Sequence, residues 1–384
     1  MRIGVDARLL MDPAGTGMRS FLYHLLEELW RTDQNNEYFL YATGPLHLPF
    51  DPESSPRWHV RIGRGWPAKI NILWMQTSLN LLVRRDRLNV FLGTRHVLPY
   101  FLRLFAPDVR RVSIIFDIFA VTTPRVTPFK TWFYNISNTV LSCRLADVLV
   151  ATSESTRRDL VRTLKIDPQK IHVVYGAANE AIFYPRPGAS RDLDEKYGIK
   201  KPFILSGDVH NPRKNFSTVL RTYARLPDHL KNSHDLVGTG APATFYSAYS
   251  VEEDVKALGL EDHVRLVGLI DHLDMPLFYS AAALFAFPSL YEGFGLPILE
   301  AMSCGCPVIT SNVSSMPEAG GDSAFYVDPE NPKELRKHMT SLLTDINLNR
   351  EMSSKGLANA ERFSWEAYAK KVLKTCALAC ESNG

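Results

Sequence analysis

Short apolar runs alternate along this sequence with longer segments whose apolar residues recur at helical spacing. This alternation restricts the fold more than any other feature of the chain. The run 2–7 has the length of a buried strand, and segment 20–31 places its leucines and Phe21 on one helical face. Strands that alternate with helices favour βαβ units and a parallel sheet. Further strand-like runs occupy 38–42, 89–92, 112–116 and 148–151.

The alternation is interrupted once, at 177–190, where Pro185, Pro187 and Gly188 replace any periodic pattern. A break of this composition is typical of a linker between domains. An amphipathic helix is predicted for 364–380, with Ser364 as its N-cap. The chain is therefore predicted to hold two α/β domains in tandem. The strand-like runs of the second series occupy 203–207, 234–238, 264–267, 284–287, 307–310 and 324–327.

The composition is that of an ordinary globular protein. The 384 residues are 45% apolar and 22% charged, which excludes disordered, collagen-like and coiled-coil chains. No run approaches the roughly 18 apolar residues of a membrane-spanning helix. Asp6 and Arg8 interrupt the N-terminal stretch where a signal peptide needs an apolar run, and the five cysteines are few and odd in number. We therefore expect a protein of the reducing cytoplasm, without disulfides.

The net charge of +3 conceals an uneven distribution. Residues 1–185 hold 23 lysines and arginines against 16 acidic residues, whereas residues 186–384 hold 21 against 25. The basic first half is expected to meet something anionic: a nucleic acid, a phosphorylated substrate or a membrane. Segments 66–87 and 95–111 mix aromatic, apolar and basic residues. They fit helices in a membrane interface and core helices with basic rims equally well.

The segment 287–302 combines several features of a ligand site. It follows a strand and enters a helix at Pro297, while Gly293 and Gly295 let the backbone approach a ligand closely. The free N–H groups at the start of such a helix bind anions. Glu292 in the loop and Glu300 in the helix could accept hydrogen bonds from sugar hydroxyls, although glutamate near a helix N-terminus is also common for structural reasons.

This segment, FPSLYEGFGLPILEAM, resembles the donor-binding segment of the GT4 family of retaining glycosyltransferases. The resemblance extends to 203–216 (FILSGDVHNPRKNF), 263–289 and 362–373, and so covers most of the chain. It implies the GT-B fold, in which two Rossmann-like domains with parallel sheets face each other across a cleft. The expected parts are an acceptor-binding domain at 1–180, a nucleotide-sugar-binding domain at 181–363, and a helix at 364–384 that crosses back.

The resemblance also implies roles for the donor site. Glu300 would hold the ribose hydroxyls and Glu292 the hydroxyls of the sugar. The cations Arg213 and Lys214 would stabilise the diphosphate that leaves, which is the physical role of such cations in a transition state. No metal and no cofactor are then required. Backbone N–H contacts to the donor are expected at Gly293, Phe294, Gly295 and Leu296.

In the first domain the resemblance implies that Gly15 and Gly17 lie near the donor phosphate. Arg95 and His96 follow a strand and are candidates for acceptor contacts, although a structural histidine is as good an interpretation of His96. GT4 enzymes commonly carry His-Asp after the next strand, whereas this chain has Phe116 before Asp117. We include Asp117 among the expected catalytic residues. Phe116 predicts an altered preference for donor or acceptor.

The predicted activity is transfer of a sugar from a nucleotide diphosphate to a glycan hydroxyl, with retention at the anomeric carbon. The sequence as a whole resembles those of bacterial mannosyltransferases of O-antigen and exopolysaccharide assembly. We therefore expect GDP-mannose as donor and a lipid-linked glycan as acceptor at the inner face of the membrane. A UDP- or dTDP-sugar donor, a sugar-nucleotide epimerase and a non-catalytic binding protein are the alternatives. Nucleic acid is not an expected partner.

Overall fold

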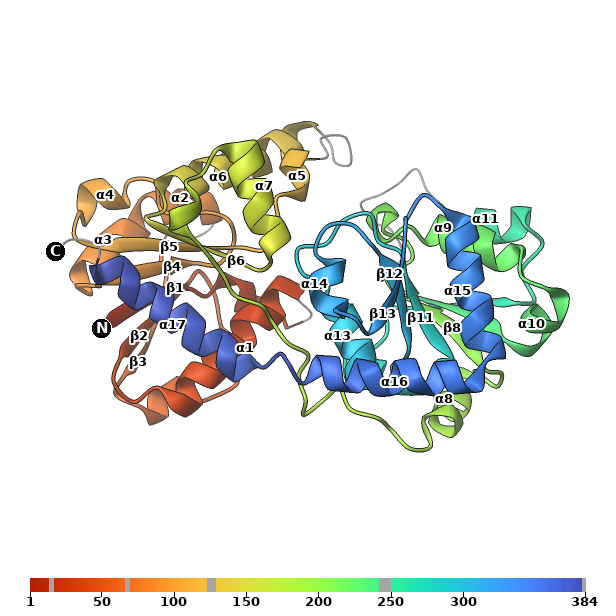
Figure 1. Ribbon diagram of the computed structural model, residues 1–384. Helices are drawn as coiled ribbons and strands as arrows, with labels where there is room; N and C mark the ends of the chain where they lie inside the picture. Colours follow the sequence, from red (N-terminus) through yellow and green to blue (C-terminus); the bar gives the residue numbers. More distant parts are fainter. Residues whose placement is uncertain (14–16, 66–69, 123–128, 242–249, 382–384) are drawn as a thin grey trace. The chain divides into compact units, whose positions relative to one another are not determined.

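The structure is a computed structural model that describes residues 1–13, 17–65, 70–122, 129–241 and 250–381. It separates into two compact units, shown in Figure 1 and described here one at a time. Unit 1 comprises Met1–Gly176 and Trp365–Gly384, and unit 2 comprises Ala177–Ser364. The boundaries expected from the sequence, 180/181 and 363/364, lie close to these divisions.

Unit 1 is built around a parallel sheet. Its strands are β1 (Arg2–Asp6), β2 (Glu37–Ala42), β3 (Trp58–Ile62), β4 (Val90–Gly93), β5 (Arg110–Ile115), β6 (Val148–Ala151) and β7 (Ile171–Val173). In the described part of the chain these seven strands have the order β3-β2-β1-β4-β5-β6-β7. The helices are α1 (Gly17–Thr32), α2 (Asn71–Gln76), α3 (Ser78–Arg85), α4 (Leu102–Phe105), α5 (Phe119–Thr122), α6 (Phe129–Leu145), α7 (Glu154–Leu164) and α17 (Trp365–Glu381).

The C-terminal helix α17 packs within unit 1, although its sequence follows unit 2. Figure 1 shows it in blue beside the red α1. The Trp365 ring meets Phe21 of α1 edge-on at 5.2 Å between ring centroids, and Tyr368 meets the same ring at 5.5 Å. The chain leaves the unit beside this cluster at Gly176, where a Cβ atom would lie 2.5 Å from the Phe21 ring. Only glycine fits that close approach.

Unit 2 repeats the architecture. Its strands are β8 (Phe203–Ser206), β9 (Asp235–Thr239), β10 (Val264–Gly268), β11 (Leu284–Phe287), β12 (Val308–Ser311) and β13 (Ala324–Val327). Among the described residues these six strands form a parallel sheet of order β10-β9-β8-β11-β12-β13. The helices are α8 (Ala189–Tyr197), α9 (Phe216–Ala224), α10 (Asp228–Ser233), α11 (Val251–Ala257), α12 (Met275–Ala281), α13 (Leu296–Ser303), α14 (Met316–Gly320), α15 (Pro332–Thr344) and α16 (Ile346–Ala360).

The predicted α/β class with two parallel sheets is confirmed. The central strands β4, β6, β8 and β11 are buried at every residue, which is why the sequence shows them as continuous apolar runs rather than alternating ones. In each sheet the first strand has neighbours on both sides, so the strand order reverses there. Ligands of such sheets bind beyond the carboxyl ends of the strands at this reversal. The loops after β1 and β4 in unit 1, and after β8 and β11 in unit 2, are therefore the places to examine.

Two edge strands, β3 and β7, were not predicted. β3 carries His59 and Arg61 and is only partly buried, and β7 has just three residues. Short edge strands with polar residues lack the apolar run that identifies a central strand. The segments 66–87 and 95–111 contribute α2, α3 and α4, each short and each with buried residues on one side. Within the described residues, no helix is both long enough and apolar enough to cross a bilayer.

Candidate active site

The loop that joins β11 to α13 forms one side of the candidate site in unit 2. It contains Glu292 and ends at Gly295, which precedes the first turn of α13 with φ of +103°. That backbone conformation favours glycine, and a Cβ at this position would press on the Ile298 side chain at 3.2 Å. Pro297 lies in the first turn, where its missing N–H costs no helical hydrogen bond.

Glu292 is a buried carboxylate held by two partners. Its Oε1 accepts hydrogen bonds from Lys214 Nζ at 2.7 Å and from Ser289 Oγ at 2.6 Å. Arg213 lies further away, with its guanidinium 3.8 Å from the other carboxylate oxygen. Burial acts to raise the pKa of Glu292, but the charges of Lys214 and Arg213 outweigh it and lower the pKa from its usual value. The side chain is therefore ionised and paired.

Lys214 is buried as deeply as its partner. It ends a 3₁₀ turn, Pro212–Lys214, whose preceding residue Asn211 accepts a hydrogen bond from the Arg213 N–H. The Lys214 ammonium also lies 4.8 Å from the centre of the Phe287 ring, at the end of β11. The resemblance assigns both cations to the leaving diphosphate, and the sequence predicts no partner for either within the chain. The structure buries Lys214 in an ion pair, with only 8% of the residue exposed, and leaves the Arg213 side chain 21% exposed.

Asn215 ties the neighbouring loops of this sheet edge together. It adopts a left-handed φ of +58°, and its side-chain amide donates to the carbonyl of Pro288 at 3.1 Å and to that of Pro329 at 2.8 Å. The Leu290 N–H donates to the Arg213 carbonyl at 2.8 Å. The loops after β8, β11 and β13 are thus linked directly, and this fixes the distance between Lys214 and Glu292.

The backbone of Glu292 is held by two serines that the sequence analysis missed. The Glu292 N–H donates to Ser314 Oγ at 3.2 Å, and Ser314 Oγ donates back to the Glu292 carbonyl at 2.7 Å. Ser315 Oγ donates to the same carbonyl at 2.9 Å. Both serines follow β12, so their position at the carboxyl end of a predicted strand was the available signal. Serine has no distinctive spacing, and the signal was too weak to use.

Glu300 occupies a different environment from Glu292. It lies in α13 and accepts a hydrogen bond from the Tyr279 hydroxyl of α12 at 3.3 Å. Burial raises the pKa of Glu300 to about 7, against the opposing effects of the Tyr279 hydrogen bond and the Lys214 charge. The two carboxyl groups therefore differ, since the pKa of Glu292 lies below its usual value and the pKa of Glu300 is raised to about 7. Phe294, between them, turns its ring into the core against Phe363, with ring centroids 5.6 Å apart.

In unit 1, His96 and Asp117 follow the adjacent parallel strands β4 and β5, so both lie at the same sheet edge. His96 has a left-handed φ of +57°, and its Nε2 accepts a hydrogen bond from the Phe116 N–H at 2.9 Å. Burial lowers the pKa of His96, opposed by the charge of Asp117. A neutral ring that accepts through Nε2 carries its proton on Nδ1. One ring nitrogen of His96, Nε2, thus has a structural role in holding the Phe116 backbone. Arg95, beside it in the sequence, is exposed.

Phe116 is a core residue. It is 6% exposed, and its ring packs edge-on against Phe21 of α1 at 5.2 Å between centroids. The other expected residues of this unit lie around α1. Gly17 is the first residue of that helix, where a Cβ would have open space on every side. Gly15 lies outside the described residues.

The described residues contain no group of three or more histidine, cysteine, aspartate or glutamate side chains placed to hold a metal ion. The side chains at the unit 2 sheet edge carry charges of both signs. The arrangement offers a buried ammonium, a partly exposed guanidinium, an ionised carboxylate and a partly protonated one. Such a set can bind a diphosphate and several hydroxyl groups.

Comparison with known proteins agrees with this chemistry. Residues 15–182 match the family described as Glycosyltransferase Family 4, and residues 190–358 match Glycosyl transferases group 1. The chain is 31% identical to the O-antigen chain mannosyltransferase B of Escherichia coli over 72% of this chain and 71% of that protein. It is 30% identical to the serotype-specific mannosyltransferase WbdA of Escherichia coli over 57% of this chain, which corresponds to only 27% of that longer protein.

Among solved structures, Anabaena HepE in complex with UDP-glucose has a TM-score of 0.77 at 18% identity, over 98% of this chain and 99% of that one. This likeness concerns the fold. Two parallel-sheet units of this topology give the chain the GT-B fold. The matches to the two family models and to the mannosyltransferase relative show that it is a glycosyltransferase. The same matches show that the chain belongs to the GT4 family of glycosyltransferases.

Proposed function

We propose that this glycosyltransferase moves mannose from GDP-mannose to a hydroxyl of a growing surface glycan, with retention at the anomeric carbon. The observation that carries the proposal is the Lys214–Glu292 pair, with Arg213 beside it, at the carboxyl edge of the unit 2 sheet. Mannose is favoured because the two Escherichia coli relatives are named mannosyltransferases. UDP- and dTDP-sugars are the alternative donors.

In the proposed mechanism the bond from the anomeric carbon to the diphosphate breaks, and the acceptor oxygen bonds to that carbon on the same face. The departing diphosphate oxygen takes the acceptor proton. Arg213 and Lys214 stabilise the negative charge that develops on the leaving group, where such cations lower a barrier most. Glu292 accepts hydrogen bonds from the sugar hydroxyls and Glu300 from the ribose. The backbone from Gly293 to Leu296 donates N–H groups to the donor.

The proposed mechanism needs no metal ion or cofactor, because the two cations supply the positive charge. Turnover is expected to be unchanged by EDTA. A loss of turnover that Mg²⁺ or Mn²⁺ restores would refute this part of the proposal. The acceptor is proposed to contact the unit 1 sheet edge, where Arg95, His96 and Asp117 lie, with Gly15 and Gly17 near the donor phosphate. We propose a cytoplasmic location for the reaction, on an acceptor carried by a lipid diphosphate.

The test is a panel of GDP-, UDP- and dTDP-sugars measured by thermal shift and by turnover with a glycan acceptor. A donor that binds the folded state raises the midpoint of unfolding, by an amount that grows with its concentration above the dissociation constant. GDP-mannose is expected to give the largest shift and the highest rate. A larger shift with a UDP- or dTDP-sugar would refute the choice of donor. Conversion of the sugar nucleotide to an epimer without an added acceptor would show that the enzyme is an epimerase and would refute the proposed transfer.

A further inference from the structure

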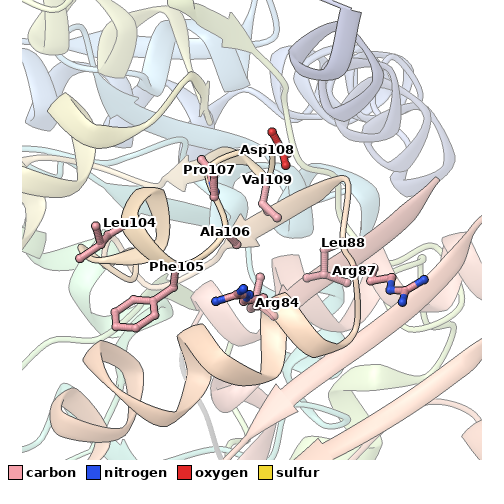
Figure 2. Close-up of a pocket in the computed structure, with 10 residues that line it drawn as sticks. Arg84, Arg87, Leu88, Leu104, Phe105, Ala106, Pro107, Asp108 and Val109 are labelled. Atoms are coloured by element: carbon pink, nitrogen blue, oxygen red, sulfur yellow. The ribbon is translucent and has the colours of Figure 1, made fainter.

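The hollow shown in Figure 2 lies in unit 1, beside α3. It measures ≈ 470 Å³, and the picture shows Leu104 and Phe105 on one side of it and Arg84 on the other. None of its lining residues belongs to the candidate site. What holds the site side chains of unit 2 in place is therefore found in their own contacts, and these contacts differ between the two glutamates.

The carboxyl group of Glu300 has one hydrogen-bond donor within the described residues. The Tyr279 hydroxyl donates to Oε2 at 3.3 Å, whereas Oε1 accepts no hydrogen bond from the described part of the chain. Glu292, by contrast, is held by both Lys214 and Ser289. A glutamate side chain turns about several bonds, and fixing it in one orientation costs conformational entropy. The Tyr279 hydroxyl is therefore the polar contact that orients the Glu300 carboxyl.

Tyr279 is itself fixed by its surroundings. It lies in α12, is 2% exposed, and its ring meets Phe285 of β11 edge-on at 5.3 Å between centroids. The preceding residue, Phe278, is fully buried and packs against Tyr197 at 5.0 Å between centroids, which holds α12 against rotation. Because β11 also leads into the loop of Glu292, the Tyr279 hydroxyl has a fixed place relative to that loop.

The Tyr279 hydroxyl is a donor to the ionised form of Glu300. Burial, and next the charge of Glu300, raises the pKa of Tyr279 well above its usual value, so the hydroxyl keeps its proton near neutrality. Its hydrogen bond lowers the pKa of Glu300, as the charge of Lys214 also does, against the effect of burial. Among the described residues, no charged group of α14, α16 or β12, which also pack on α13, acts on Glu300. The thiols of Cys304 and Cys306 act on Tyr279 but stay protonated, because burial raises the pKa of both.

We propose that Tyr279 is a positioning residue for the nucleotide: its hydroxyl holds Glu300 Oε2 and so directs Oε1 to the ribose hydroxyls. The inference rests on the proposed ribose contact of Glu300. In the alternative, Tyr279 only fills space between α12 and β11, and its hydroxyl is hydrogen-bonded because a buried polar group needs a partner. A positioning role affects only nucleotides that carry ribose hydroxyls, whereas a packing role affects all nucleotides alike.

The test removes the hydroxyl in Tyr279→Phe, which keeps the buried ring. Dissociation constants are measured between about pH 6 and about pH 9 for GDP and UDP, which both carry ribose, and for their 2′,3′-dideoxy forms, which lack both ribose hydroxyls. Loss of the hydrogen bond raises the pKa of Glu300, so the midpoint of the pH dependence is expected to move upward by about 0.5 pH unit. Affinity for GDP at neutral pH is expected to fall about three- to tenfold, the usual cost of ordering one flexible side chain on binding. Affinity for dideoxy-GDP is expected to equal that of the wild type.

A matched control lies at the start of α12. The Tyr197 hydroxyl donates to Asp274, the residue before α12, at 2.6 Å. Tyr197→Phe therefore removes the same atom from a contact with a carboxylate other than Glu300. This variant is expected to bind GDP with the affinity and the pH dependence of the wild type. A loss of GDP affinity equal to that of Tyr279→Phe would show that loosening α12 is sufficient and would overturn the proposal.

Two further results would overturn the positioning role. Tyr279→Phe could bind GDP with the midpoint and the affinity of the wild type, or it could lose as much affinity for dideoxy-GDP as for GDP, which would assign Tyr279 to packing. Failure of the proposed ribose contact gives a different result. The wild type would then bind GDP and dideoxy-GDP equally well, and Glu300→Gln would bind GDP as tightly as the wild type.

Discussion

The buried pair of Lys214 and Glu292 gives the sharpest prediction for unit 2. The perturbation is a double-mutant cycle with Lys214→Met, Glu292→Gln and the combination. Lys214 Nζ and Glu292 Oε1 are 2.7 Å apart, and neither residue is more than 8% exposed. Removing one member of a buried pair strands the other charge and costs about 3–5 kcal/mol. Arg213 at 3.8 Å and Ser289 at 2.6 Å still compensate Glu292 when Lys214 is lost, which places Lys214→Met near the lower limit.

We therefore expect each single variant to lower the free energy of unfolding of unit 2 by about 3 kcal/mol. The double variant strands no charge, so it is expected to lose no more than either single variant, rather than the sum of the two. The coupling free energy between the two side chains is then at least about 3 kcal/mol, at the upper end of measured couplings. Turnover is expected to fall by about 100-fold or more in the Lys214 variant if the ammonium stabilises the leaving group.

The sequence provides a way to assign the effect to one unit. All 6 tryptophans lie in the sequence of unit 1, at positions 30, 58, 66, 74, 132 and 365. Urea unfolding followed by tryptophan fluorescence thus reports unit 1, whereas far-UV circular dichroism reports both units. The variants should shift the dichroism transition and leave the fluorescence transition in place. Additive losses in the double variant would refute the coupling, and an equal shift in fluorescence would refute its assignment to unit 2.

Three further predictions concern single positions. The pKa of Glu300 is raised to about 7, so GDP affinity is expected to rise between pH 6 and pH 8 as the carboxyl ionises and accepts hydrogen bonds from the ribose hydroxyls. Glu300→Gln should remove this pH dependence. A wild-type affinity that does not change with pH would contradict the ribose-binding role of Glu300. Glycine at position 314 fits the φ of +55° but loses both hydrogen bonds to the Glu292 backbone. The donor KM is therefore expected to rise about tenfold in Ser314→Gly, as in Ser314→Ala. A wild-type KM in the glycine variant would show that the Ser314 hydroxyl does not contribute to donor binding. Phe116→His places a polar ring against Phe21. It is expected to lower the free energy of unfolding of unit 1 by about 2 kcal/mol, measured by tryptophan fluorescence. An unchanged midpoint would show that the position tolerates imidazole.

Most of the architecture could be predicted from local patterns. The strands that form the middle of each sheet are apolar throughout because helices cover both of their faces, so their sequences stand out from the amphipathic helices between them. The edge strands β3 and β7 do not stand out, because one side of each is unpaired and their side chains are partly exposed. The positions of Glu292 and Lys214 after strands were likewise visible in the sequence.

The partners of those residues were not visible. Glu292 and Lys214 are 78 residues apart, and they meet because β11 pairs with β8 in a register that sets Phe285 opposite Leu205. Ser314 reaches the Glu292 backbone through the next strand, β12. The burial of Phe116 against α1 also depends on packing between distant segments.

The sequence by itself thus determined the class of fold, the two sheets and the loops that carry the charged residues, because hydrophobic periodicity is a local property of the chain. Only the tertiary structure decided that Lys214 is a buried partner of Glu292 rather than an exposed cation, and that the two glutamates differ in protonation. Burial and pairing set the charge of each side chain, and both depend on which loops the strand order brings together at the sheet edge.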